Sequence, residues 1–390
     1  MIKFEEAYRI VMNEVRVMPA ERVQIMDSLG RVLAEDIFSD IDMPPFNKSA
    51  VDGFACREAD LDSNLEIIET IPAGKTPKFT VTEGKCSGIM TGSMLPEGAD
   101  CVIMVEDTLI LDNGRMRASQ KQKSRNISVQ GEDIKAGDRV LTAGTLIKPQ
   151  HLAVLASTGK ITPKVSKKVQ VGILSTGDEL VEPEHLPSAA KIRNTNAYQL
   201  SAQVTAAGAL PRYEGIAADT ETSLSAMLSY SLDRNDIVIL TGGVSMGDFD
   251  YVPKVMADLD IEILFKSVAI QPGRPTVFGK KGNQFIFGLP GNPVSSFVIF
   301  EVLVKPFLLK SMGCTEEQEM LHLPLGTTFR RKKSERKSLI PVRIDNGQVF
   351  PVEYHGSAHI NAYTQAQGIL MIEIGKTELL KGEIADVRSL

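Results

Sequence analysis

Two glycine-rich segments hold the polar side chains of this chain that are best placed to do chemistry. Each follows a short apolar run typical of a buried strand, VQVGIL in one case and DIVIL in the other. The residues after these runs are Ser175, Thr176, Gly177, Asp178 and Glu179 in the first segment, and Thr241, Gly242, Gly243, Ser245, Gly247, Asp248 and Asp250 in the second. Glycines let the backbone approach a ligand, and the N-terminus of a following helix favours an anion. TGGVSMGD therefore predicts a phosphate or pterin cradle, with a purely structural turn as an equal alternative.

Carboxylates gather in the same segments. Asp178 and Glu179 follow one run, Asp248 and Asp250 follow the other, and Asp219 follows RYEGIA, a third apolar run. Carboxylates crowded beside a phosphate repel it unless a hard cation lies between them, and Mg²⁺ with oxygen ligands is the usual solution. The pattern predicts a magnesium site at one edge of a sheet. For Asp219, which precedes TETS, capping of a helix is an equally good explanation, and both roles are compatible.

A second pair of loops could hold an oxyanion. AIQPGRPTVFG and FGLPGNPVSSF supply Gly273, Arg274, Pro275, Pro290, Gly291, Asn292, Pro293 and Ser295. The Arg274 guanidinium offers fixed donors that suit an oxyanion. Ser295 opens a helix whose N-terminus would face that anion, although capping alone would also explain a serine there.

The elements that must position these residues are those of a parallel α/β sheet. Apolar runs alternate with helical patterns in the order VQVGILST, NAYQLSAQVTAAG, RYEGIA, TETSLSAMLSYSL, DIVILTGG and YVPKVMADL. In such sheets ligands bind at the carboxyl ends of the strands, which is where both glycine-rich segments fall. The first residues predict an amphipathic helix, because Phe4, Ala7, Tyr8, Val11 and Val15 recur at helical spacing.

Before and after this block the sequence predicts β-structure. Short runs between about Leu61 and Lys135, namely LEIIETI, KFTVTEG and DCVIMVED, indicate an all-β module. Within it, Asn113 and Gly114 suit a two-residue type I′ hairpin, since both central positions of that turn need positive φ. The same pair recurs at Asn346 and Gly347 and indicates a small β-domain at the C-terminus, after a helix that ends near Met312.

Composition excludes several classes of protein. With 43% apolar residues the chain can build two to four cores, and its net charge of −6 offers no basic field for nucleic acid or a membrane surface. No apolar run approaches the roughly 18 residues of a membrane span, and the charged N-terminal residues are unlike a signal peptide. The four cysteines show no disulfide or zinc spacing, so we expect a soluble, cytoplasmic protein.

Two further patterns favour structural explanations over functional ones. The basic run FRRKKSERKS, at residues 329–338, is short for a nucleic-acid patch in an acidic protein and favours a solvated linker or strand. His355 and His359 lie in predicted β or turn structure, which favours a surface or packing pair over a metal site.

The ordered motifs resemble those of the molybdopterin molybdenumtransferases, the MoeA family, whose animal relatives include the gephyrin E domain. The motifs are, in order, MPPFNKSAVDGFA, PAGKTP, IMTGSMLPEGADCVIMVED, NISVQGEDIKAGD, ILSTGDEL, TGGVSMGDFDYV, QPGRPTVFG and GLPGNPVSS. They cover roughly residues 1–310. The last eighty or so residues match the family only in layout.

The resemblance implies a multidomain α/β plus β fold. A central parallel α/β pterin-binding domain would be combined with an inserted β-module, an extended linking domain and a C-terminal β-domain. The expected segments are 1–42 and 136–168 for the linking domain, 43–135 for the β-module, 169–313 for the α/β domain and 314–390 for the C-terminal domain. The family works as a homodimer, with an active site between the α/β domain of one protomer and the β-module of the other. Asp52, in SAVDGF, would reach the site across that dimer.

The family reaction takes adenylylated molybdopterin and molybdate, releases AMP and leaves molybdenum on the dithiolene sulfurs. By resemblance, the family's functional polar positions are Asp52, Thr91, Asp133, Glu179, Asp219 and Asp250, with Mg²⁺ ligands among Glu179, Asp219 and Asp250. The pterin and phosphate contacts fall to Thr176, Gly177, Asp178, Gly242, Gly243, Ser245 and Asp248. The molybdate pocket would use Arg274 and Ser295, with Arg343 and Ser357 from the C-terminal domain. Gly273, Pro290, Gly291 and Asn292 are further expected substrate-binding residues.

One position departs from the family pattern. Many members read K-P-G-K-P where this chain has QPGRP, so Gln271 lacks an expected positive charge and Arg274 replaces a lysine. The alternatives are the molybdopterin adenylyltransferase, which would not need residues 43–135, a non-catalytic pterin-binding scaffold, and a tungsten-handling paralogue. The resemblance implies as partners the adenylyltransferase and the molybdoenzymes that receive the cofactor.

Overall fold

The computed structural model describes residues 1–390 except 121–123, 245–250 and 354–358. The chain forms two compact units. The large unit comprises Met1–Ala34, Gly144–Lys148 and Pro163–Leu390, and the small unit comprises Glu35–Ala143 and Pro149–Thr162. None of the described helices combines the length and the apolar character that a membrane crossing requires.

A six-stranded sheet forms the body of the small unit. Its strand order is β7-β4-β6-β5-β9-β8, with β7 at Cys101–Met104, β4 at Gly53–Cys56, β6 at Lys85–Ile89, β5 at Leu65–Ile71, β9 at Arg115–Ala118 and β8 at Thr108–Ile110. The shorter elements of the unit are β2 (Ile37–Phe38), β3 (Lys48–Ser49), β10 (Ile127–Ser128), β11 (Arg139–Leu141) and α2 (Pro149–Ser157). The sheet confirms the predicted β-module. Its core includes Cys56, Cys86 and Cys101, and all four cysteines of the chain are buried free thiols.

One predicted strand of this module does not form. The run KFTVTEG contains no strand, because the backbone N–H groups of Lys78 and Phe79 donate to the carboxylate of Glu69 (3.1 Å to Oε1 in each case). These donors are therefore taken by a side chain, where a strand would offer them to a neighbouring strand.

The two Asn-Gly pairs behave differently. Asn346 and Gly347 both have positive φ (47° and 71°) and directly join paired residues of β24 and β25, so the two-residue type I′ hairpin is confirmed. At the other pair only Gly114 has positive φ. There the Asn113 side chain accepts from Arg115 N (3.1 Å), and Leu111 N donates to Arg115 O, which gives a longer loop. The type I′ turn predicted at this position was wrong.

The α/β domain of the large unit contains a second six-stranded sheet. Its order is β16-β13-β17-β21-β20-β18, with β16 at Leu210–Ala217, β13 at Gln170–Thr176, β17 at Ile237–Thr241, β21 at Gln284–Leu289, β20 at Val277–Lys281 and β18 at Glu262–Phe265. The first four strands are parallel to one another, whereas β20 and β18 are antiparallel to their neighbours. The predicted parallel sheet thus forms the larger part of a mixed sheet.

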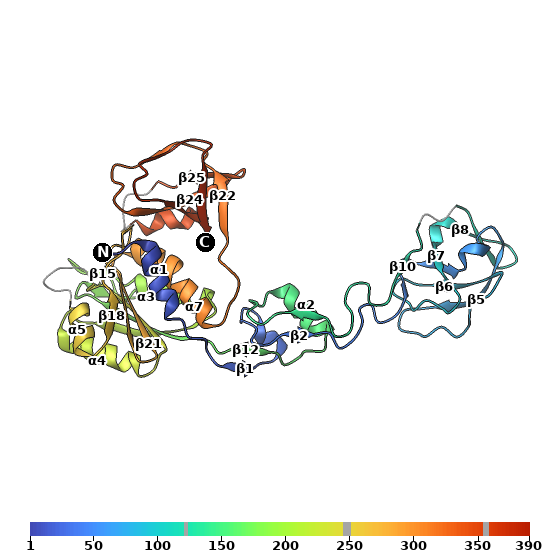
Figure 1. Ribbon diagram of the computed structural model, residues 1–390, viewed down its shortest axis with the longest axis horizontal. Helices are drawn as coiled ribbons and strands as arrows, with labels where there is room; N and C mark the ends of the chain where they lie inside the picture. Colours follow the sequence, from blue (N-terminus) through green and yellow to red (C-terminus); the bar gives the residue numbers. More distant parts are fainter. Residues whose placement is uncertain (121–123, 245–250, 354–358) are drawn as a thin grey trace. The chain divides into compact units, whose positions relative to one another are not determined.

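Helices cover both faces of this sheet (Figure 1). One face packs on α1 (Phe4–Asn13), α3 (Asn196–Ala206), α6 (Pro293–Ile299) and α7 (Lys305–Ser311), with a π-helical segment, η4 (Phe300–Val304), between α6 and α7. The other face packs on α4 (Glu221–Leu232) and α5 (Val252–Asp258). Successive strand residues alternate between the two cores, as Ile173 and Leu174 do. The strands are therefore apolar on both sides, which is why they could be predicted.

The C-terminal β-domain has its own sheet and core. The strand order is β19-β24-β26-β28-β22, and β25 pairs with β24. The bounds are β19 Ile270–Gln271, β24 Lys337–Asp345, β26 Gly368–Ile372, β28 Ile384–Ser389, β22 Met320–Pro324 and β25 Gln348–Pro351. Because β19 belongs to a loop of the α/β domain, its parallel pairing with β24 attaches the two domains (Ile270 to Lys337, Gln271 to Ser338).

The remaining short strands of the large unit form three pairs: β1 (Ala20–Arg22) with β12 (Lys164–Ser166), β14 (Leu180–Val181) with β15 (Ile192–Arg193), and β23 (Phe329–Arg330) with β27 (Glu378–Leu379). Helix α1 confirms the predicted N-terminal helix, and its buried residues Phe4, Ala7 and Val11 join the core of the α/β domain. The division into a linking domain and three others remains a prediction.

Candidate functional site

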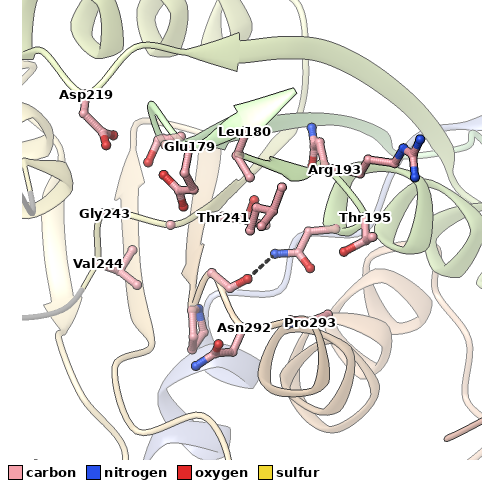
Figure 2. Close-up of a pocket in the computed structure, with 18 of the residues that line it drawn as sticks. Glu179, Leu180, Arg193, Thr195, Asp219, Thr241, Gly243, Val244, Asn292 and Pro293 are labelled. Carbon is pink, nitrogen blue, oxygen red and sulfur yellow. Dashed lines mark hydrogen bonds between the residues drawn. The ribbon is translucent and has the colours of Figure 1, made fainter. Parts of the chain in front are cut away.

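The carboxyl ends of four parallel strands open into one cavity of about 900 Å³, which we call the strand-end cavity. Thr176 ends β13, Thr241 ends β17, Asp219 follows β16, and Pro290 follows β21. The four ends meet because parallel strands all terminate at the same edge of the sheet. In Figure 2 the side chains of Glu179 and Asp219 lie on one side of the cavity, and Asn292 and Pro293 lie on the other.

The loop after β17 fits closely against the loop after β13. Gly242 has φ of 94°, and a Cβ atom at this position would lie 2.5 Å from the backbone oxygen of Thr176. No other residue type can occupy this position without moving one of the two loops. The bare backbone of Gly242 and Gly243 thereby faces the cavity.

Asp178 and Asp219 connect the loop after β13 to the loop after β16 by two reciprocal hydrogen bonds. Asp178 N donates to Asp219 Oδ2, and Asp219 N donates to Asp178 Oδ1, both at 3.1 Å. Glu179 and Asp219 line the cavity, and Lys191 Nζ donates to the backbone oxygen of Asp178. Within the part of the chain that the structure describes, no group of three or more His, Cys, Asp or Glu side chains is arranged to hold a metal.

A buried polar chain supports the floor of the cavity. Thr241 Oγ1 donates to Ser175 Oγ (3.3 Å), and Ser175 Oγ donates to Asn194 Oδ1 (3.1 Å). Asn194 Nδ2 donates to Tyr213 Oη (2.9 Å), which donates to Glu182 Oε1 (2.6 Å). Burial, together with the Glu182 carboxylate, raises the pKa of Tyr213, so this tyrosine remains a donor at neutral pH. The chain fixes the orientation of Asn194, which lines the cavity.

Helix α3 holds the opposite loop. Asn196 Nδ2 donates to Gly291 O (2.7 Å), and Gln199 Nε2 donates to Pro293 O (3.1 Å). Asn196 also accepts from Ser296 in α6 (3.4 Å). The Pro-Gly-Asn-Pro loop is thus fixed by side chains of one helix, which leaves Asn292 free to face the cavity.

A second cavity of about 780 Å³, the basic cleft, shares Pro275, Pro290 and Asn292 with the first. Five cations line it, and no carboxylate is among its described lining residues. These cations are Arg274, Arg331, Lys332, Lys333 and Arg336. A cleft that carries one sign of charge and no opposing groups attracts anions.

The five cations do not have the same role. Arg331 donates to the backbone oxygens of Lys376 (2.6 Å), Arg336 (2.8 Å) and Glu373 (2.5 Å), so its guanidinium holds the loop in shape. Arg336 donates to Gln271 Oε1 (3.3 Å), in the segment that β19 attaches to β24.

The other three cations of the cleft keep their donors free. Arg274, Lys332 and Lys333 make no side-chain hydrogen bond or ion pair with residues that the structure describes. Their charges are therefore available to an anion that enters the basic cleft.

In the small unit, Asp52 and Thr91 lie together. Thr91 donates to Asp52 Oδ1 from its backbone N (2.6 Å) and from its hydroxyl (2.9 Å). These donors stabilise the carboxylate and hold the pKa of Asp52 below its usual value. Asp133 lies on the surface of the same unit, where its backbone N donates to Met43 O (3.1 Å).

Three family models match consecutive parts of the chain. The MoeA N-terminal region (domain I and II) matches residues 2–159, the probable molybdopterin binding domain matches 172–310, and the MoeA C-terminal region (domain IV) matches 324–390. The molybdopterin molybdenumtransferase of Staphylococcus aureus (strain Mu50) is 36% identical over 403 residues, which cover 99% of this chain and 95% of that protein. The chain belongs to the MoeA family. It is a transferase of molybdenum cofactor biosynthesis.

Other relatives agree with this family. The molybdopterin molybdenumtransferase of Staphylococcus epidermidis (strain RP62A) is 33% identical over 400 residues, with 99% and 95% of the two chains covered. The crystal structure of the molybdopterin biosynthesis MoeA protein from Pyrococcus horikoshii OT3 covers all of both chains at a TM-score of 0.85 and 29% identity. The multidomain fold expected from the sequence is thereby confirmed.

The structure brings most of the residues predicted from the MoeA motifs to the two cavities. The strand-end cavity is lined by Thr176, Gly177, Glu179, Asp219, Gly242, Gly243, Pro290, Gly291 and Asn292, and the basic cleft by Gly273, Arg274, Pro290, Asn292 and Ser295. Ser245, Asp248, Asp250 and Ser357 lie outside the described residues. Asp178 adjoins the strand-end cavity through its hydrogen bonds to Asp219.

Arg343 lies elsewhere. It pairs with Asp345 (3.4 Å), its guanidinium lies 5.5 Å from the centre of the Phe350 ring, and it is not among the described residues that line either cavity. Strand β24 directs it to the hairpin, so the structure gives no support to its predicted place in the molybdate pocket.

Sequence reasoning missed two sets of cavity residues. Lys191, Arg193, Asn194 and Asn196 line the strand-end cavity, and the signal for them is the basic and amide-rich segment KIRNTN, which ends at the first residue of α3. Lys332, Lys333 and Arg336 line the basic cleft. The run that contains them was predicted to be a solvated linker or strand, and the pairing of β19 with β24 brings it to the cleft.

Proposed function

We propose that this chain inserts molybdenum from molybdate into adenylylated molybdopterin with release of AMP, in a reaction that depends on Mg²⁺. The observation that carries the proposal is the shared wall between the two cavities. Pro275, Pro290 and Asn292 line both the strand-end cavity and the basic cleft. A phosphorylated pterin in the first and an oxyanion in the second would therefore be neighbours, as a transfer between them requires.

The strand-end cavity suits the adenylylated pterin. Its volume of about 900 Å³ lies within the range of pockets that hold large ligands. The backbone of Gly242 and Gly243 offers a close approach for phosphate, Lys191 and Arg193 contribute positive charge, and Asn292 offers amide groups for the pterin ring.

The carboxylates fit a magnesium ion. Mg²⁺ is commonly held by one or two carboxylates together with substrate phosphates and water, and Glu179 and Asp219 supply two carboxylates at the cavity. Asp250, the third predicted ligand, lies outside the described residues. When bound there, the ion would neutralise charge on the phosphates.

The chain's own residues would position the reactants. The basic cleft would hold molybdate through Arg274 and Ser295, with Lys332 and Lys333 as further cations and Arg336 beside Gln271, where many family members carry a lysine. An oxygen of water would form a bond to phosphorus as the bridging P–O bond of the pyrophosphate breaks, which yields AMP and the pterin monophosphate. If an oxygen of molybdate attacked the pterin phosphorus instead, AMP would leave and water would then hydrolyse the molybdate–phosphate bond. The two dithiolene thiols would bind molybdenum through sulfur as one molybdate oxygen leaves as water, with no change of oxidation state.

We further propose that the enzyme is a homodimer in which Asp52 of one copy serves the strand-end cavity of the other. Asp52 is exposed and held as an anion by Thr91, and the exposed apolar side chains of Met90, Met104 and Val105 lie at the same end of the sheet, where Gly53 pairs with Ile89 and Met104. Exposed apolar groups beside a fixed carboxylate favour a protein contact at this end of the sheet.

The decisive experiment measures AMP release from adenylylated molybdopterin by the purified protein with Mg²⁺, with and without molybdate, followed by a molybdenum assay of the pterin. Molybdate-stimulated AMP release with molybdenum retained on the pterin is the expected result. A folded protein that binds the pterin and releases no AMP would instead support the scaffold. Formation of adenylylated pterin from ATP, without metal insertion, would support the adenylyltransferase.

A further inference from the structure

A third cavity lies in the large unit, and none of its lining residues lines the strand-end cavity or the basic cleft. Its volume is about 450 Å³. It is formed by helices α1 and α7, by residues 316–318 and by strands of the C-terminal β-domain. We call it the Arg388 cavity. The residues that line it are Phe4, Glu5, Tyr8, Pro306, Leu309, Lys310, Glu316, Glu317, Gln318, Met320, Lys337, Met371 and Arg388.

Arg388 is the unusual member of this set. Its residue in β28 is 6% exposed, and its side chain makes no hydrogen bond with the part of the chain that the structure describes. Its Nε is fully buried without a partner. Burial lowers the pKa of the guanidinium to about 10, so the group is still charged at neutral pH.

The neighbouring charges do not neutralise Arg388. Two neighbouring groups act electrostatically on Arg388, first Tyr8 and then the carboxylate of Glu301, which already accepts from Lys305 Nζ and Gln203 Nε2, both at 2.8 Å. Lys337 lines the same cavity and is also buried, at 7% exposed. Its charge is neutralised in the usual way, by ion pairs with Glu5 and Glu373, both at 2.7 Å. A buried cation without such a partner destabilises the fold.

The walls of the cavity indicate the kind of molecule that would supply the missing partner. Phe4, Tyr8, Leu309, Met320 and Met371 give it an apolar surface, and methionines adapt to varied shapes. A guanidinium binds a carboxylate through two parallel hydrogen bonds.

Other lining groups narrow the choice further. Three carboxylates also line the cavity, of which Glu5 pairs with Lys337 and Glu316 with Lys148 (3.3 Å), and they disfavour multiply charged anions such as phosphates more strongly than a singly charged one.

We propose that the Arg388 cavity binds a small organic monocarboxylate, with its carboxylate on Arg388 and its apolar body against Phe4, Tyr8 and the two methionines. This site is separate from the proposed molybdenum transfer, so either can be right without the other. The burial of an unpaired guanidinium then has a functional reason, because the ligand completes the ion pair.

The test uses 3-phenylpropanoate as the probe with the full-length protein. Calorimetric titration is expected to give one site, and the probe is expected to raise the unfolding temperature. The neutral 3-phenylpropanamide and inorganic phosphate should bind at least about 10-fold more weakly, since neither offers a single carboxylate to the guanidinium. Arg388→Met should weaken binding of the probe by a similar factor. Arg330→Gln is the matched control, because Arg330 is an exposed arginine of the same β-domain that pairs with Glu378 (2.6 Å).

A second readout separates a binding role from a structural one. Without the probe, Arg388→Met should unfold at the same temperature as the parent protein or higher, since it removes an unpaired buried charge. In the unchanged protein, the NMR signal of the Arg388 Nε–H should shift when 3-phenylpropanoate is added, which does not depend on any variant folding. No binding of the probe, equal binding by Arg388→Met, or an unmoved Nε–H signal would overturn the proposal and leave Arg388 as a hydrated structural residue.

Discussion

At the scale of single residues, Asp219 joins the two tasks of the strand-end cavity. Its Oδ2 accepts from Asp178 N, and its own N–H donates to Asp178 Oδ1, so the side chain both fixes the neighbouring loop and faces the cavity. A residue that only capped a helix would need no reciprocal partner in another loop. The helix after it is in fact capped by Thr220, whose side chain accepts from Ser223 N. The capping alternative for Asp219 is therefore not needed.

Replacing Asp219 by alanine should reduce the rate of AMP release by at least about 100-fold, because the variant lacks a carboxylate that would face the substrate phosphates. The loss of one partly exposed hydrogen bond should cost only about 1 kcal/mol of unfolding free energy. AMP release and urea unfolding measure the two effects. Asp258→Ala, at an exposed aspartate of α5, is the control and should leave both unchanged. Normal AMP release by the Asp219 variant would remove this residue from the reaction.

Arg274 is the cation predicted to bind molybdate, and its side chain has no partner among the described residues that could neutralise it. In Arg274→Ala the molybdate concentration for half-maximal AMP release should rise by at least about 10-fold, while saturation with molybdate should restore much of the rate. The control is Arg330→Ala, which removes a cation of the basic run at residues 329–338 that does not line the cleft. An unchanged molybdate dependence would place the oxyanion elsewhere.

The contact between Thr91 and Asp52 predicts a pH effect. Because the folded-state pKa of Asp52 is lowered, the contact contributes stability above the unfolded-state pKa of about 4 and loses it as the pH falls through the folded-state value. Thr91→Val keeps the backbone donor but removes the hydroxyl, so the pKa of Asp52 should rise toward its usual value. A ¹³C NMR titration of the Asp52 carboxyl measures this, with Thr80→Val, at an exposed threonine of the same unit, as the control. An unmoved pKa would mean that the backbone N–H of Thr91 is sufficient.

At the scale of elements, the sequence was sufficient wherever a strand is buried on both faces. β13 and β17 are such strands, and the polar residues at their ends could be placed at one edge of the sheet before the structure was known. The predictions were wrong where a side chain competes for the backbone. The Glu69 carboxylate accepts from the N–H groups of Lys78 and Phe79, and the Asn113 side chain accepts from Arg115 N. Hydrophobic patterns in the local sequence do not predict such hydrogen bonds between side chain and backbone.

The basic cleft could not be predicted for a different reason. Its wall is set by the pairing of Gln271 with Ser338, which are far apart in the sequence and belong to different domains. Local composition correctly describes Lys332, Lys333 and Glu335 as exposed and charged, whereas Arg331 and Arg336 are half-buried. Local composition cannot predict that the basic residues among them line the basic cleft, because their position depends on contacts made by β24 and by Arg331.

The loop after β17 offers a test with a matched pair of glycines. Gly242 and Gly282 both have positive φ, 94° and 60°, but only at Gly242 would a Cβ meet backbone, with Thr176 O at 2.5 Å. Gly282→Ala should therefore lower the free energy of unfolding by about 1 kcal/mol, because alanine is disfavoured in a left-handed conformation, and the variant should release AMP at the parent rate. Gly242→Ala should lower the free energy of unfolding by more, about 2 kcal/mol or above. The variant should also lose pterin binding, because the loop must move to make room for the Cβ atom. Urea unfolding and AMP release distinguish the two. Equal effects at both positions would show that the close approach of the two loops has no role.

At the scale of the whole molecule, the chain's two units divide the predicted catalytic residues between them. Asp52, Thr91 and Asp133 belong to the small unit, whereas Glu179 and Asp219 belong to the large unit. A site that uses both groups must join the units either within one chain or between two copies. In the proposed homodimer the site joins two copies, and mixing two inactive variants can distinguish this arrangement from a site within one chain.

Asp52→Ala and Asp219→Ala should each be inactive in AMP release when purified alone. If the site joins two copies, random reassociation of a one-to-one mixture gives half heterodimers, and one of the two sites in each heterodimer carries both native aspartates. AMP release should then recover to about one quarter of the parent rate. If the site lies within one chain, every chain in the mixture lacks one aspartate, and no activity can return. A mixture of Asp52→Ala with itself, taken through the same dissociation and reassociation, is the control for the handling. Recovery to about one quarter would establish the shared site, and a mixture as inactive as this control would exclude it.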